Sequence, residues 1–132
     1  FRGLVFFNSL SDLGATEERL QFNGASAVSL ASDINVKFRK VILEKFKNHE
    51  ISLLLGTDLL ARGIDIENLE VVINFDIPRD REAYTHRSGR TGRMGNEGRV
   101  ISLVSHPEDL KKLKKFAKVS EIVLKNQEIH EK

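Results

Sequence analysis

The sequence predicts an α/β fold, a three-layer sandwich of helices around a mostly parallel central sheet. Short apolar runs alternate along the chain with segments of helical character. Most of these runs are apolar on successive residues, as expected for strands that helices cover on both faces. Strands joined through helices usually run parallel, so the order of elements favours a largely parallel sheet.

The expected elements follow the chain in a regular order. The expected strands are residues 4–7, 27–30, 51–55, 71–75 and 99–104. The expected helices are residues 9–22, 35–47, 81–88 and 108–118. No repeat or long linker interrupts this order, so the sequence predicts one domain over residues 1–118. Residues 119–132 are interpreted as an extension of that domain or the start of a tail.

Several helix ends carry supporting residues. Asn35 is the expected N-cap of the second helix, with Leu43 and Phe46 recurring at helical spacing on its buried side. Asp80 is the expected cap of the third helix. The last helix has acidic residues in its first turn and lysines later, which complements the helix dipole, and those lysines are interpreted as a solvated face. Its expected apolar stripe consists of Leu110, Leu113 and either Phe116 or Ala117.

Composition excludes several classes of protein. With 132 residues, of which 40% are hydrophobic, the chain can bury a core, and its net charge of +2 does not indicate nucleic-acid binding. The absence of cysteine excludes disulfides and thiolate chemistry, and the four histidines lack metal-ligand spacing, so no metal-binding residues are predicted. No apolar run reaches the roughly 18 residues of a membrane span. We therefore expect a cytoplasmic protein without a membrane partner.

The first residues also carry information. The chain opens FRGLVFFNS, without an initiator methionine and almost directly with a core strand. A complete protein rarely begins its core so abruptly, so we expect this domain to belong to a longer chain.

The segment YTHRSGRTGR brings three arginines close together. Arg87, Arg90 and Arg93 recur every three residues and would share one side of a continued helix. Gly89 and Gly92 predict instead that the helix ends within the segment. Arginine clusters commonly bind phosphate, and three targets remain open at this point: RNA backbone, a nucleotide or a phosphorylated partner.

A second polar segment, GTDLLARGIDI, follows the third strand. Thr57 and Asp58 fall at the carboxyl end of this strand, where functional residues of parallel sheets gather. They could cap a short helix or contact a phosphate. The chain has no Gly-Lys dipeptide, and therefore lacks the loop that cradles phosphates in many nucleotide-binding domains. Arginines can neutralise phosphate here, but nothing holds most of a nucleotide.

Together these segments resemble the C-terminal RecA-like domain of DEAD-box ATP-dependent RNA helicases. LVFFNS is similar to motif IV of that family, and DINVKFRKVILEKF lies where the QxxR helix belongs. TDLLARGIDI is similar to motif V, and YTHRSGRTGR with MGNEGR to motif VI. The histidine of HRSGRTGR favours the DEAD-box group over DEAH-type helicases.

The resemblance implies half of an ATPase site. ATP and Mg²⁺ would be bound mainly by an N-terminal RecA-like domain of the same protein, which this sequence does not include. Arg90 and Arg93 would be arginine fingers that reach the γ-phosphate and act in catalysis. Gly63 and Asp65 would approach the nucleotide from this side, and Arg87 would help to join the two domains.

The resemblance also implies contacts with RNA through Asn8, Arg39 and Thr57. Such contacts address the sugar-phosphate backbone, so binding without sequence specificity is expected. This sequence departs from the family where Val36 replaces the usual glutamine of QxxR. It departs again at residues 31–33, where Ala-Ser-Asp replaces His-Gly-Asp. Valine cannot hydrogen-bond, so the grip of this helix on RNA is expected to differ.

Three functions follow as hypotheses. The first is the second domain of a helicase that couples RNA binding and ATP hydrolysis to local duplex unwinding, with the isolated chain inactive. The alternative is a free-standing RecA-like module that binds RNA or a protein and has no ATPase role. A third hypothesis is a related helicase that acts on DNA.

Overall fold

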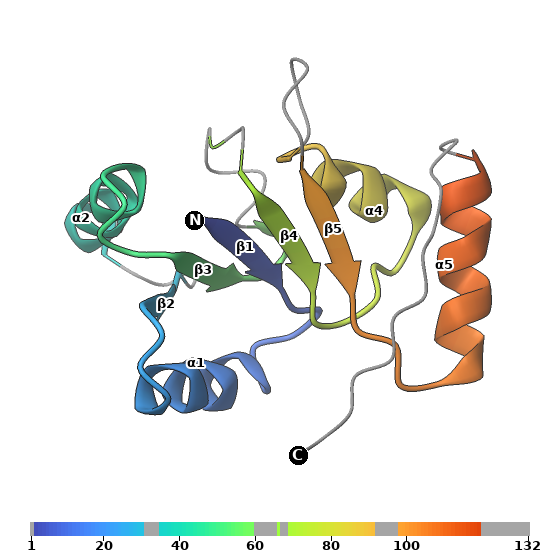
Figure 1. Cartoon of the computed structure of the whole chain (residues 1–132), viewed down its shortest axis with the longest axis horizontal. Coiled ribbons are helices and arrows are strands. Elements are labelled where there is room, and N and C mark those ends of the chain that lie inside the picture. Colours follow the sequence, from blue (N-terminus) through green and yellow to red (C-terminus); the bar gives the residue numbers. More distant parts are fainter. Residues whose placement is uncertain (1, 31–34, 60–65, 67–68, 92–97, 120–132) are drawn as a thin grey trace.

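The structure is a computed structural model that describes residues 2–30, 35–59, 66, 69–91 and 98–119. Strands and helices alternate through these residues, as expected (Figure 1). In chain order they are β1 (Gly3–Phe6), α1 (Leu13–Phe22), β2 (Ala27–Ser29), α2 (Val36–Lys47), β3 (Leu53–Gly56), β4 (Val71–Asn74), α4 (Arg81–Ser88), β5 (Arg99–Ser102) and α5 (Pro107–Val119).

The strands form one sheet in the order β2-β3-β1-β4-β5, and every neighbouring pair is parallel. The predicted α/β fold is therefore confirmed, with a sheet more uniform than the expected mostly parallel one. β1 lies in the centre, where Gly3 stands opposite Leu53 on one side and Val71 on the other. A Cβ atom at Gly3 would lie 2.5 Å from Cγ1 of Val71, which explains a glycine in a central strand.

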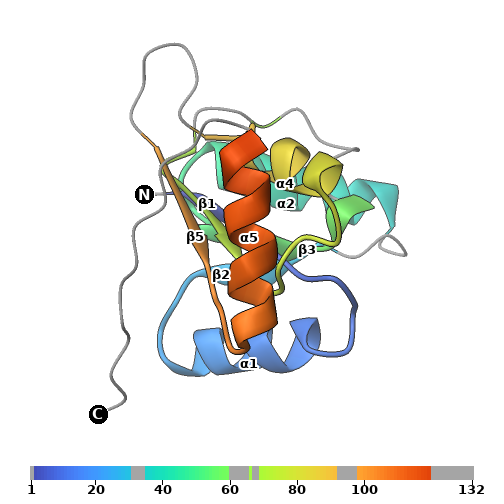
Figure 2. The same cartoon turned by 90° about the vertical axis from the view of Figure 1, so that its right-hand side faces the viewer.

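Each face of the sheet has its own core. On one face Leu4, Phe6 and Leu54 pack with residues of α2, including the fully buried Phe46. On the other face Phe7 and Leu55 belong to a cluster with Leu13 of α1. Figure 2 shows α1 separated from α2 and α4 by the strands. The alternation of side chains along parallel strands thus produces the three layers that the sequence predicts.

Most predicted helix ends are confirmed by hydrogen bonds. Oδ1 of Asn35 accepts from the amide of Lys37 at 2.8 Å, and Oδ1 of Asp80 accepts from the amide of Ala83 at 2.8 Å. Helix α1 differs, because it begins at Leu13 and not at residue 9. The segment before it forms bends and a turn.

The edge strand β5 departs from the expectation of strands buried on both faces. Val100 and Ile101 are exposed at this edge of the described sheet. Helix α5 packs against α4 through Leu113 and Phe116, whose ring lies 6.0 Å from that of Tyr84. This contact confirms the predicted apolar stripe. The exposed lysines of this helix are Lys111, Lys114 and Lys115.

The two phenylalanines of α2 provide a test of this core. Replacing the fully buried Phe46 with alanine should lower the free energy of unfolding by about 3–5 kcal/mol, since it removes a ring and leaves a cavity. Phe38 lies on the same helix and is 64% exposed, so Phe38→Ala should change stability by less than about 0.5 kcal/mol. Urea denaturation of both variants measures the difference, and equal losses would contradict the assigned core.

Candidate functional site

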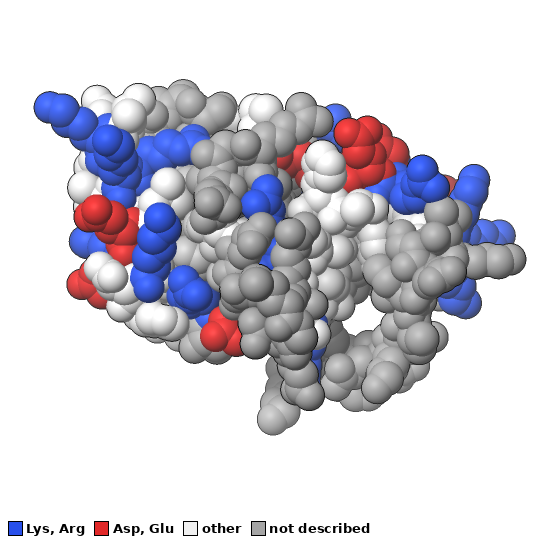
Figure 3. Space-filling view, turned by 90° about the horizontal axis from the view of Figure 1, so that it is seen from above, with Lys and Arg blue, Asp and Glu red and all other residues white. Residues whose placement is uncertain are grey.

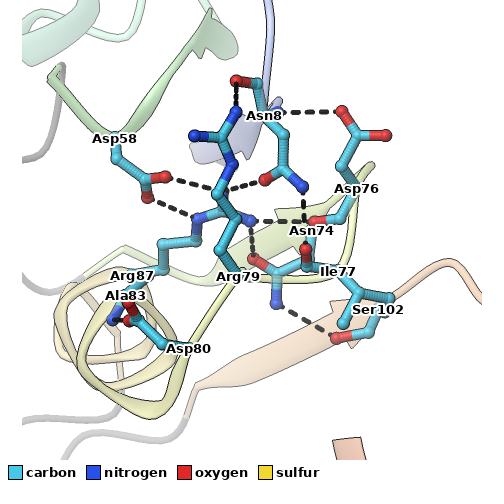
Figure 4. Close-up of polar contacts among 10 residues, drawn as sticks. All are labelled: Asn8, Asp58, Asn74, Asp76, Ile77, Arg79, Asp80, Ala83, Arg87 and Ser102. Atoms are coloured by element: carbon cyan, nitrogen blue, oxygen red, sulfur yellow. Dashed lines mark hydrogen bonds and ion pairs between the residues drawn. The ribbon is translucent and has the colours of Figure 1, made fainter. Parts of the chain in front are cut away.

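The centre of the site is the side chain of Arg87, which is completely buried. All of its guanidinium N–H groups donate to acceptors within the domain (Figure 4). Nε and Nη2 donate to the two carboxylate oxygens of Asp58 at 2.7 and 3.0 Å. Nη1 donates to Oδ1 of Asn74 at 3.2 Å and to the carbonyl of Asp76 at 2.8 Å. Nη2 also donates to Oδ1 of Asn8 at 2.8 Å.

These acceptors converge because parallel strands end at the same edge of a sheet. Asn8 follows β1, Asp58 follows β3, and Asn74 is the last residue of β4. The side-chain amide of Asn74 donates onward to Oγ of Ser102, the last residue of β5, at 3.0 Å. The network of Arg87 therefore joins the carboxyl ends of four strands to α4.

The surroundings of Arg87 explain how a buried cation is tolerated. A guanidinium without acceptors would be costly to remove from water, and a bidentate carboxylate with further hydrogen bonds offsets that cost. The ring of Phe6 adds a cation–π contact, with its centroid 5.2 Å from Cζ of Arg87. The carboxylate of Asp58 is 36% exposed and so remains in contact with solvent.

Asn8 fastens the loop after β1 to the loop after β4. Its backbone amide donates to Oδ2 of Asp76 at 2.8 Å, and its side-chain amide donates to the carbonyl of Ile77 at 3.0 Å. Its carbonyl accepts from Nη2 of Arg79 at 3.0 Å. With Oδ1 bound to Arg87, the side chain of Asn8 is held in one orientation.

A pocket of about 440 Å³ opens beside this network. Asp58 and Asn8 belong to both the network and the pocket wall, and they are the two residues at which the pocket and the network meet. The amino end of α4 contributes the acids Asp80 and Glu82, while Arg79 and His86 bring basic groups. The full lining consists of Asn8, Ser9, Leu10, Thr57, Asp58, Leu59, Arg79, Asp80, Glu82, Ala83 and His86.

The structure brings two of the three predicted RNA contacts together. Asn8 and Thr57 both line the pocket, whereas Arg39 is half-buried on α2 and is not among the lining residues. Lysines and arginines gather on the α2 side of the molecule (Figure 3). Val36, which stands in place of the usual glutamine, is 70% exposed in the first turn of α2.

The predicted arginine finger Arg90 lies at the opposite end of the strands, beside the amino end of β4. Helix α4 ends at Ser88 with Gly89 as its C-cap, so the predicted end of the helix is confirmed. The carbonyl of Arg90 accepts from the amide of Leu69 at 3.1 Å, just before β4 begins. The hydroxyl of Thr91 donates to the carbonyl of Leu69. The expectation that functional residues gather at the strands' carboxyl ends therefore does not describe Arg90.

The structure describes only one of the four remaining predicted residues. Arg93, Gly63 and Asp65 lie outside the described residues. Arg87 is described, but its donors are all used inside the domain. Its predicted role between two domains stays a prediction, and the placement shows a role within one domain.

Sequence reasoning missed the partners of Arg87. The sequence pattern indicates Asp58 only as a cap or a phosphate contact, and it places Asn74 within an apolar strand. The available signal was the polar Asn74 within the otherwise apolar run VVINF. An asparagine buried with its strand requires hydrogen-bond partners, and Asn74 is fully buried.

Two titratable groups close to the site have shifted pKa values. The backbone amide of Arg2 donates to Glu70 at 2.8 Å and lowers the pKa of that carboxyl. Burial raises the pKa of the Tyr84 hydroxyl on α4. Both shifts move away from neutrality, so neither group changes protonation near pH 7.

The residues that the structure describes contain no candidate metal site and no membrane-spanning helix. No group of three or more His, Asp or Glu side chains there could hold a metal ion. No helix in the same part of the chain is long and apolar enough to cross a membrane.

Comparisons with known proteins agree with this geometry. Residues 1–95 match the family described as the helicase conserved C-terminal domain. The probable ATP-dependent RNA helicase YfmL of Bacillus subtilis is 46% identical over 117 residues, which cover 89% of this chain and 31% of YfmL. The chain thus spans about a third of that relative's length.

Two solved structures have a similar backbone. The Escherichia coli DEAD-box protein SrmB, solved bound to the regulator of ribonuclease activity A, has a TM-score of 0.86 at 32% identity, covering 97% of this chain and 75% of SrmB. Dbp5 of Saccharomyces cerevisiae, solved bound to RNA and ADP BeF3, has a TM-score of 0.80 at 29% identity, covering 89% and 32%. The fold is that of a helicase RecA-like domain. The chain belongs to the DEAD-box RNA helicases, as their C-terminal domain.

The network predicts a large difference between two neighbouring arginines. Replacing Arg87 with methionine leaves Asp58 and Asn74 without their donors, so the free energy of unfolding should fall by about 3–5 kcal/mol. Arg79 is exposed and donates to one described carbonyl, so Arg79→Met should cost less than about 1 kcal/mol. Denaturation curves of both variants test this, and a loss at Arg87 no larger than at Arg79 would contradict the structural role.

Proposed function

We propose that this chain is the ATPase-completing half of an ATP-dependent RNA helicase that couples RNA binding and ATP hydrolysis to local duplex unwinding. The observation that carries the proposal is the placement of the Arg90 backbone. Its backbone is fixed beside β4, in a chain that has no Gly-Lys phosphate loop of its own. An arginine positioned without a nucleotide cradle fits a domain that completes a site formed mainly by another domain.

RNA is the proposed nucleic-acid partner. Asn8 and Thr57 line one pocket, and α2 presents Arg39 on a side of the molecule rich in lysine and arginine (Figure 3). Dbp5, which is similar in structure, has been solved bound to RNA. Hydroxyl, amide and guanidinium groups recognise phosphate and sugar, so the proposed binding does not depend on base sequence.

ATP with Mg²⁺ is the proposed cofactor, bound mainly by an N-terminal RecA-like domain of the same protein. When bound, ATP supplies the phosphoryl group whose transfer to water drives the cycle. Arg90 and Arg93 would neutralise charge on the phosphates, while Gly63 and Asp65 would allow close approach to the nucleotide. We place the whole protein in the cytoplasm.

The division into halves predicts that the 132-residue chain does not hydrolyse ATP alone. It should show no RNA-stimulated release of phosphate above background, because the residues that hold ATP lie in the other domain. A phosphate-release assay of the purified chain, with and without single-stranded RNA, measures this. Robust RNA-stimulated hydrolysis by the chain alone would contradict the proposal.

In the full-length protein, Arg90→Lys should remove most turnover. A lysine keeps the charge but loses the planar fork, and an arginine finger contributes about 10³–10⁵-fold to kcat. The affinities for ATP and RNA should remain within about threefold, since the contribution is made in the transition state. Arg81→Lys, at an exposed position of α4, is the matched control.

The result also separates the competing functions. If Arg90→Lys weakened RNA binding and left hydrolysis intact, the arginine cluster would be an RNA-binding patch and not part of an ATPase site. Single-stranded DNA should activate hydrolysis far less than RNA does, and equal activation would favour a helicase that acts on DNA.

A further inference from the structure

The two parts of the proposed site lie at opposite ends of the parallel strands. Thr57 and Asn8 line the pocket at the carboxyl ends of the strands. Arg90 lies at the amino end of β4, where its carbonyl accepts from Leu69. Helix α4 runs between the two ends (Figure 1). Any coupling of RNA binding to Arg90 therefore has to extend from the carboxyl ends of the strands to their amino ends.

One connection between the two ends of the strands passes through the side chains of Asp58 and Arg87, and Asn8 joins it by accepting directly from Nη2 of Arg87 at 2.8 Å. Thr57 is joined covalently to Asp58, whose carboxylate holds Arg87 at 2.7 and 3.0 Å. The carbonyl of Arg87 in turn accepts from the amide of Arg90 at 3.4 Å. The ion pair of Asp58 and Arg87 is thus one residue from the pocket-lining Thr57 and one helical turn from Arg90.

Exposure differs between the two members of this pair. Arg87 is 0% exposed, whereas the carboxylate of Asp58 is 36% exposed and lines the pocket (Figure 4). A carboxylate that accepts two hydrogen bonds from Arg87 still has lone pairs for a ligand. A molecule in the pocket can therefore approach Asp58 and Asn8, which both accept hydrogen bonds from Arg87, whereas the buried Arg87 itself is out of its reach.

We propose that Asp58 is a positioning residue, which holds Arg87 and thereby sets the position of Arg90 relative to the RNA-binding pocket. The proposal rests on the proposed function and deepens it, since it names Asp58, which binds Arg87 through two hydrogen bonds, as a residue that joins the pocket to the arginine. Asp58 does not itself touch the reacting atoms. Its effect is carried by the fixed geometry of α4 and the turn that follows it.

Asp58→Asn is the most selective change for testing this inference. Asparagine has nearly the same shape but no charge, and its NH₂ group would face a guanidinium donor in place of one acceptor. Arg87 keeps Asn8, Asn74 and the carbonyl of Asp76, so the domain retains most of the network. Glu18→Gln, on the exposed face of α1, is the matched change of carboxylate to amide. Asp58→Glu tests whether a carboxylate alone restores the effect.

The first measurement is amide hydrogen exchange in the full-length protein. In Asp58→Asn, the amides of Arg90 and Thr91 should exchange about tenfold faster or more than in wild type, as expected for local loosening. The amides of Leu54 and Val72 in the sheet should change by less than about threefold. Asp58→Glu should regain part of the protection, and Glu18→Gln should behave as wild type. Unchanged protection at Arg90, or an equal increase throughout the sheet, would overturn the proposal.

The second measurement is RNA-stimulated ATP hydrolysis by the same full-length variants. Asp58→Asn should lower kcat about 10–100-fold, while the Kd for RNA without nucleotide changes by less than about threefold. A weaker affinity for RNA with an unchanged kcat would make Asp58 a simple RNA contact and would refute the positioning role. If wild-type protein showed no RNA-stimulated hydrolysis, the proposed function would fail, and hydrogen exchange would still decide whether Asp58 positions Arg90.

Discussion

The buried guanidinium of Arg87 needs five acceptors, and no single segment of this chain can provide them. Three strand ends, the following loop and one helix have to be correctly placed before each N–H group finds its partner. The parallel sheet meets this requirement because it brings the carboxyl ends of its strands to one edge. In turn, the cost of burying an unpaired cation opposes any movement that would separate these ends.

This constraint gives the two edges of the domain different characters. At the carboxyl ends of the strands the polar groups form a rigid hydrogen-bond network, in which Asn8 is held through its backbone and its side chain. The amino edge carries Arg90 on a turn that is tied to Leu69 and Arg87 through backbone hydrogen bonds. Helix α4 links them, so a residue proposed to bind RNA and an arginine proposed to act on phosphate can belong to one rigid body without being neighbours.

Much of the fold could be predicted from the sequence because its signals are local. Apolar runs, the caps Asn35 and Asp80 and the glycine after α4 each act within a few residues. The position of Arg90 was also within reach. An eight-residue helix and a four-residue strand are each roughly 12–13 Å long, so α4 must return to the amino end of β4.

The network itself could not be predicted in this way. An arginine between a helix and a glycine has the same local pattern whether it binds phosphate or is buried, and the acceptor in Asn8 lies 79 positions away. The exposure of β5 could not be predicted for a similar reason, because the run RVIS is compatible with a central strand and with an edge strand. Both features depend on which segments become neighbours only after folding.

The long separations within the network have a consequence for the order of folding. Closing a contact between Arg87 and Asn8 requires a loss of chain entropy that the hydrogen bonds within a helix do not incur. These hydrogen bonds are therefore expected to form on the native side of the folding barrier, with φ-values near zero at Arg87 and Asp58. An incompletely folded chain would then contain helices and a partial sheet before it held Arg90 in place. The domain would become competent to act on phosphate only once its last strand ends had docked.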